Sequence, residues 1–132
     1  AIRLFGGSFG IDDVRGMEIR LTVDGADDGF RLDGASSLRE ISRDPLDLAG
    51  QACGPNNHYP DGLMLYTGTM FAPTDDRDAP GQGFTHHLGD IVAIATPTLG
   101  TLRNRVNHAH RLPRWQFGAG ALMANLAVRG LL

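Results

Sequence analysis

The chain has 132 residues, of which 42% are hydrophobic and 20% charged, and its formal net charge at pH 7 is −3. This composition is typical of a folded globular chain and excludes a disordered tail; the length allows one domain, residues 1–132, but no large catalytic fold. The 15 acidic residues outnumber the 12 basic ones, all of them arginine. The charge balance therefore indicates no nucleic-acid partner.

The cellular compartment is indicated by the single cysteine and by the lack of long apolar runs. Cys53 stands alone, which excludes a disulfide framework and favours a reducing environment. No run approaches the roughly 18 consecutive apolar residues that a membrane span needs. We therefore expect a cytoplasmic protein with no membrane partner. Because the chain enters an apolar stretch directly after Ala1, we also expect it to be a segment of a longer protein.

Eighteen glycines and seven prolines divide the chain into short segments, which favours strands and turns. Residues 17–23 alternate apolar and polar side chains, an Asp-Gly pair follows at 24–25, and residues 30–33 alternate again. This pattern predicts a β-hairpin. A short helix is predicted over 45–49, where Asp44 can cap it and a proline takes the first helical position.

The second half of the chain also predicts short strands, followed by a helix at its end. Residues 63–67 predict a buried strand, and residues 75–83 a solvated, mobile excursion. The apolar run 91–95 predicts a strand covered on both faces, and 100–106 its antiparallel return. A helix is expected from residue 115, where apolar side chains have helical spacing, to a favourable last-turn cation and stop at Arg129-Gly130. The predicted fold is mainly β with short helices, an α+β class.

A Gly-x-Ser-x-Gly pattern at 6–10 has the spacing of a nucleophile elbow, which places a reactive serine between a strand and a helix. Residues 11–16 do not predict a helix. We therefore interpret the pattern as a glycine turn before a strand.

Five histidines invite a metal hypothesis. His86 and His87 are adjacent and would point to opposite faces of a strand, whereas His108 and His110 would share a face. Such a pair with Asp90 or Asp61 could bind zinc, but the cysteine pairs and the His-Glu-x-x-His spacing of common zinc sites are missing. We expect surface or hydrogen-bonded histidines, and a zinc site at His86, His108 or His110 is a third alternative for the function.

Thr67-Gly68-Thr69 follows the strand predicted at 63–67. A glycine permits close approach of the backbone to a ligand, and a neighbouring hydroxyl can donate to an anionic oxygen. The motif is a candidate substrate contact, although strand ends of this kind also occur without a ligand.

Six segments in chain order carry a resemblance to a known family: residues 17–23, Ser36-Ser37-Leu38, residues 44–49, Thr67-Gly68-Thr69, Gly89-Asp90-Ile91-Val92 and residues 99–106. From about residue 16 to residue 106 the chain resembles the later part of the fumarylacetoacetate hydrolase superfamily. The tail at 115–132 is similar to a subgroup of longer members associated with dehydration of 2-keto-3-deoxy sugar acids.

The resemblance implies a mixed β-roll, like the C-terminal part of that fold, with a C-terminal helix. It implies an enzyme that chelates a 2-keto acid through a divalent ion, usually Mg²⁺, which polarises the ketone before dehydration or C–C hydrolysis. In the family the threonine of the Thr-Gly-Thr motif reaches the substrate. The resemblance therefore implies a substrate-binding role for Thr69, with Gly68 beside it, whereas Asp90 and Asn104 would hold turns of the scaffold.

The chain departs from the family where the metal binds. The family uses a Glu-x-Glu pair and aspartates, but the only glutamates here, Glu18 and Glu40, lie 22 positions apart. We therefore expect the metal ligands and the catalytic residues to be absent from this chain, and the chain alone to be inactive. Uncovered sheet edges and apolar faces would favour a homo-oligomer or a complex with a missing N-terminal segment. The alternative is a non-catalytic binding or self-assembly module built on the same scaffold.

Overall fold

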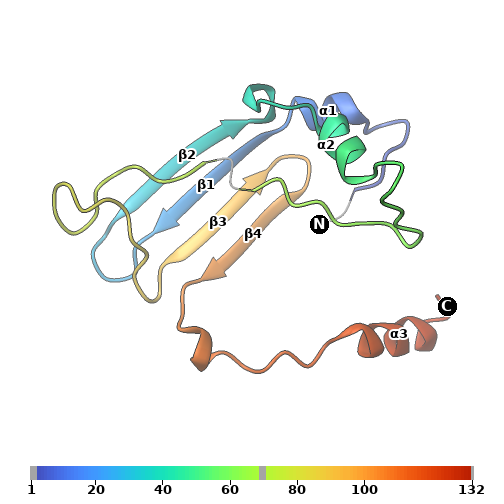
Figure 1. Ribbon diagram of the computed structural model, residues 1–132. Helices are drawn as coiled ribbons and strands as arrows, with labels where there is room; N and C mark the ends of the chain where they lie inside the picture. The colour runs from blue at the N-terminus through green and yellow to red at the C-terminus, as the bar shows by residue number, and fades with distance from the viewer. Residues whose placement is uncertain (1–2, 69–70, 132) are drawn as a thin grey trace.

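The computed structural model describes residues 3–68 and 71–131. Its centre is a four-stranded antiparallel sheet with the strand order β2-β1-β3-β4, and the three short helices of the first half of the chain lie at one end of it (Figure 1). In chain order the elements are α1 (Ile11–Arg15), β1 (Glu18–Asp24), β2 (Arg31–Ser37), η1 (Leu38–Glu40), α2 (Pro45–Ala52), β3 (Ile91–Thr96), β4 (Gly100–Arg105), η2 (Ala109–Arg111) and α3 (Ala119–Val128). The α+β class is confirmed. None of the helices in the described ranges is long and apolar enough to cross a membrane.

The predicted hairpin is confirmed as β1 and β2, which pair from Glu18 opposite Ser37 to Asp24 opposite Arg31. Directly opposite residues of antiparallel strands share a face of the sheet. Val23 and Leu32 are opposite each other and nearly inaccessible to solvent, so the buried core lies on their face. We call it the apolar face.

A close contact covers the β1–β2 half of the apolar face. Gly34 lies opposite Leu21 on this face, and a Cβ atom built on Gly34 would stand only 2.3 Å from the Phe71 ring. The ring therefore occupies the space that a side chain at position 34 would fill. This contact brings the segment that begins at residue 71 across the sheet.

The predicted strand at 91–95 is confirmed as β3, but its coverage on both faces is wrong. Ile94 is 40% exposed, and its partner Leu102 on the edge strand β4 is 60% exposed. The strand is apolar because it is central in the sheet, between β1 and β4, and not because further layers enclose it. The β3–β4 half of the apolar face is consequently open.

The buried strand predicted at 63–67 is wrong. These residues make no ladder, and Tyr66 is 86% exposed. The reason is topological. The two central positions of the sheet are taken by β1, which pairs with β2 and β3, and by β3, which pairs with β1 and β4, so no central position is left for this apolar segment. Hydrophobicity alone does not distinguish a core strand from an apolar surface segment.

The exclusion of a helix at 11–16 is also wrong, because α1 occupies Ile11–Arg15. The Asp13 carboxylate accepts a hydrogen bond from the Gly10 N–H at 2.7 Å, and Arg15 pairs with Asp12 at 2.8 Å. These local contacts compensate for a weak helical pattern. The turn interpretation of residues 6–10 is confirmed by the bridge between Gly6 and Phe9, and residues 3–5 before it form no strand.

Two helix predictions are confirmed with shifted bounds. The Asp44 carboxylate accepts from the Leu46 N–H at 2.9 Å and caps α2, which ends at Ala52 rather than at residue 49. The C-terminal helix α3 begins after Gly118, so Trp115 lies outside it. Figure 1 shows α3 at the end of an extended segment that leads away from the sheet.

Candidate functional site

A cleft of about 620 Å³ lies where β2 leads into η1 and α2. Its apolar lining comes from Val14, Leu38, Ile41, Pro45 and Leu48. Its polar lining comes from Ser36, Ser37, Glu40, Ser42, Arg43 and Thr67. A partly apolar cleft with several converging polar groups is the usual form of a small-molecule site.

Local hydrogen bonds shape the rim of this cleft. Ser37 ends β2 and its hydroxyl accepts from the Arg39 N–H at 3.3 Å, which begins the turn of η1. Arg15 donates to the Asp44 carboxylate at 2.6 Å and so joins α1 to the start of α2. This hydrogen bond, assisted by that of the Leu46 N–H, lowers the pKa of Asp44. The capping carboxylate therefore stays ionised at neutral pH.

The structure places the predicted substrate motif at this cleft in part. Thr67 lines it. Gly68 follows with φ of +84°, a conformation that favours glycine, and open space lies beside its Cα. Thr69 lies outside the described residues, so its predicted contact stays a prediction.

The donors of the cleft do not fit a magnesium ion. Mg²⁺ requires near-octahedral oxygen coordination, commonly with carboxylates. Glu40 is the one carboxylate in the lining, and Arg43 lies in the same lining. Glu18 is not among the lining residues.

A second polar centre, which the sequence did not reveal, surrounds Arg77. This guanidinium is 3% exposed and donates to Asp90 at 2.6 Å, to Asp28 at 2.8 Å and to the Thr85 carbonyl at 3.2 Å. It also lies over the Phe30 ring, 4.6 Å from the ring centroid. Most of the 75–83 segment is exposed, as its composition predicts, but its arginine anchors it in the protein.

Asp90 is the buried counterpart of this arginine, with no solvent exposure. Its carboxylate also accepts from the backbone N–H groups of His87, at 2.8 Å, and Ala26, at 3.4 Å. The hydrogen bonds from Arg77 lower the pKa of Asp90 to about 2. The expectation that Asp90 holds a turn is confirmed by these contacts, whereas Asn104 lies within β4 and not in a turn.

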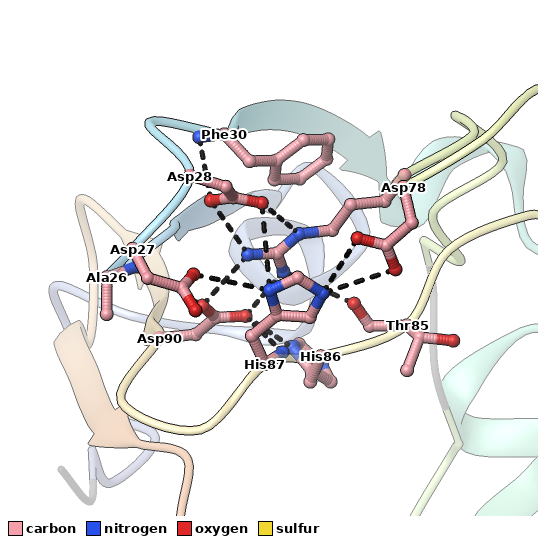
Figure 2. A network of polar contacts seen from close by, with 10 residues as sticks. Ala26, Asp27, Asp28, Phe30, Asp78, Thr85, His86, His87 and Asp90 are labelled. Carbon is pink, nitrogen blue, oxygen red and sulfur yellow. Dashed lines mark hydrogen bonds and ion pairs between the residues drawn. The ribbon is translucent and has the colours of Figure 1, made fainter.

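His87 lies at the surface of the same centre, with Asp27 and Asp78 on either side of its ring (Figure 2). Its Nε2 is 3.0 Å from Asp78 and its Nδ1 is 3.3 Å from Asp27. Hydrogen bonds to Asp78 and then Asp27 raise the pKa of His87. The protonated ring is thus stabilised by carboxylates on both sides.

Within the described ranges, one group of metal-binding side chains has ligand atoms close enough together to share an ion: Asp27, Asp28 and His87. It contains none of the residues of the predicted zinc alternative. His108 and His110 stack with ring centroids 5.1 Å apart, but they belong to no such group. Both oxygens of Asp28 already accept from Arg77. The arrangement is therefore an ion-pair network that ties three loops together.

Comparison with protein families, with characterised proteins and with solved structures finds no match to this chain.

Proposed function

We propose that the cleft beside α2 binds a small 2-keto acid, and that the chain supplies one wall of the substrate pocket of an enzyme similar to fumarylacetoacetate hydrolases. One observation carries the proposal: three of the segments on which that resemblance depends line the same cleft. They are Ser36-Ser37-Leu38, the beginning of α2 and Thr67. The first two segments are near each other in the sequence, whereas Thr67 lies 19 positions after Leu48 and reaches the cleft only through folding.

The polar lining suits an anionic ligand with a ketone. The hydroxyls of Ser37 and Thr67 can donate to carbonyl or carboxylate oxygens. Arg43 can pair with a carboxylate through two parallel N–H groups. Its present partner is Asp47, at 2.7 Å in an exposed pair. Exposed pairs of this kind are weak, so a ligand carboxylate can replace Asp47.

Catalysis requires groups from outside this chain. Since the cleft does not fit Mg²⁺, the metal ligands and the proton-transferring groups would come from another segment. The chain itself would bind and orient the acid, and the complete enzyme would catalyse either its dehydration or its C–C hydrolysis. We expect the isolated chain to bind a 2-keto acid without turning it over.

The first prediction concerns binding of pyruvate, the simplest 2-keto acid, to the 132-residue chain. Titration followed by amide NMR shifts is expected to perturb Ser37 and Thr67 with a millimolar dissociation constant. Arg43→Gln is expected to weaken binding by about tenfold, because it removes a charged donor. Arg31→Gln is the matched control, because Arg31 pairs with Asp24 at the other end of the hairpin.

L-lactate, which has a hydroxyl in place of the ketone, tests recognition of the carbonyl and is expected to bind more weakly. Magnesium is expected to leave the pyruvate affinity unchanged. Pyruvate shifts that avoid the cleft, or that persist fully in Arg43→Gln, would overturn the proposal.

The second candidate is a non-catalytic binding or self-assembly module. The exposed apolar C-terminal segment favours it, since side chains such as Trp115, which is 85% exposed, gain by association. A chain that ignores pyruvate yet associates with itself would support this candidate instead.

A further inference from the structure

The C-terminal segment 107–131, here called the arm, is apolar but covers nothing in its own chain. Among the described elements, α3 has no extensive packing with any helix or strand. The large apolar residues of the arm are exposed: Leu112, Trp115, Phe117, Leu122, Met123, Val128 and Leu131. A helix that is apolar on every side, as α3 is apart from Asn125, normally lies enclosed by other structure.

Charge is divided between the arm and the rest of the chain, here called the body. All 15 acidic residues and nine of the 12 arginines precede residue 107, whereas the arm carries three arginines, two histidines and no acidic residue. In the described residues, Arg111, Arg114 and Arg129 make no ion pair or side-chain hydrogen bond, unlike Arg15, Arg20 or Arg31 of the body. The arm is therefore positively charged, whereas the body as a whole is negatively charged.

The body has an apolar area that the arm could cover. Ile94 and Leu102 lie opposite each other on the open β3–β4 half of the apolar face. The other half is already covered at Gly34 by Phe71. An uncovered area that continues a buried one is the kind of surface that a partner completes.

We propose that the arm of one copy packs on the open β3–β4 area of a second copy, and that the second arm does the same in return. Two surfaces on one chain that complement each other generate a symmetric dimer when the exchange is reciprocal. The apolar residues of the arm cover Ile94 and Leu102, and the net negative charge of the partner's body as a whole favours approach of the positively charged arm, although β4 itself carries Arg103 and Arg105. Figure 1 shows the arm extended away from its own sheet, the orientation that exchange requires.

The chain contains its own probes for this test, because Trp115 in the arm is the only tryptophan and Cys53 in the body is the only cysteine, which is exposed. A Trp115→Phe chain carrying a dansyl acceptor on Cys53 is mixed with unlabelled chain. Energy transfer from tryptophan to dansyl then requires two chains. We expect transfer that rises with concentration, and a dimer in sedimentation over the same range.

Two variants separate the contributions of apolar packing and of charge to the stability of the dimer. Leu122→Asp is expected to weaken the dimer by about a hundredfold, because it buries a carboxylate. Arg111→Glu with Arg114→Glu is expected to weaken it by about tenfold at low salt, with a smaller effect at high salt. Arg31→Glu, a charge reversal in the body, is the matched control and should not weaken the dimer, because it makes the body more negative and leaves the charge of the arm unchanged. Circular dichroism should show the sheet intact in every variant, because the arm does not pack on it.

Three results would overturn the proposal. The first is a monomer at all concentrations up to the millimolar range. The second is Trp115 emission that is blue-shifted at every concentration, which would place the arm on its own body. The third is a dimer that Leu122→Asp leaves unchanged, which would place the interface elsewhere.

Discussion

At the scale of single residues, the buried pair of Arg77 and Asp90 is the feature on which the loop arrangement most depends. Burial of two charges is costly, and it is tolerated here because the hydrogen-bonding groups are satisfied. Arg77 donates hydrogen bonds to Asp28, Asp90 and the Thr85 carbonyl, and Asp90 also accepts hydrogen bonds from two backbone N–H groups. Removal of one partner leaves the other charged and unpaired.

Arg77→Met is therefore expected to lower the free energy of unfolding by about 3 kcal/mol or more. Urea denaturation followed by circular dichroism measures this change. The exposed pair between Arg31 and Asp24 provides the control, since Arg31→Met should have a much smaller effect. The double variant Arg77→Met with Asp90→Leu should recover much of the loss, because no buried charge remains. A single variant as stable as the parent chain would contradict this role for Arg77.

At the scale of elements, the contact of β2 with the segment from residue 71 depends on a missing side chain. Gly34 allows Phe71 to lie directly against the strand. Glycine weakens a strand through its flexibility, so its place in β2 is explained by the close approach of the ring. The hairpin and the following loop are held together at this point.

Gly34→Ala is accordingly expected to destabilise the protein by about 1 to 3 kcal/mol, because the new methyl group overlaps the ring. Gly50→Ala in α2 is the matched control and should stabilise by up to about 1 kcal/mol, because space is open there and alanine favours a helix. Thermal denaturation distinguishes the two signs. Phe71→Ala combined with Gly34→Ala should relieve the overlap, and failure of this combination to do so would place the strain elsewhere.

At the scale of the whole molecule, stability against acid depends on paired aspartates. Hydrogen bonds from arginine lower the pKa of Asp28, Asp33, Asp44 and Asp90, and those of backbone N–H groups lower the pKa of Asp76. Groups with a lowered folded-state pKa stabilise the fold above their unfolded pKa, which is about 3.9 for aspartate, and this contribution is lost as the pH falls through the folded value.

The free energy of unfolding is therefore expected to fall between pH 4 and pH 2, the latter being the approximate pKa of Asp90. Urea midpoints measured across this interval test the prediction. His87 acts in the opposite sense: its raised pKa stabilises the fold below its usual value of 6.5, and the contribution is lost as the pH rises through the folded value. His87→Gln should remove this second dependence and leave the acid-side one. A stability independent of pH from 4 to 2 would refute the acid-side role of the pairs.

The local elements follow from the sequence because their causes are local. Alternation of side chains predicts β1, and Asp44 before Pro45 predicts the start of α2. The sequence also shows that all acidic residues precede the arm at 107–131. The failures occur where a local pattern is ambiguous: residues 63–67 are as apolar as β3, but pairing in the sheet is decided by competition among strands.

The candidate site and the polar network are decided only by the tertiary structure. Ser37 and Thr67 meet in one cleft because β2, α2 and a loop converge, and no spacing in the chain encodes that meeting. The same holds for Arg77, which looks like a solvated charge among aspartates until Asp28 and Asp90 surround it. The sequence by itself determined which segments are strands, helices and charged surface, since those depend on neighbours along the chain. Folding decided which charges are buried and which apolar faces stay open, since those depend on neighbours in space.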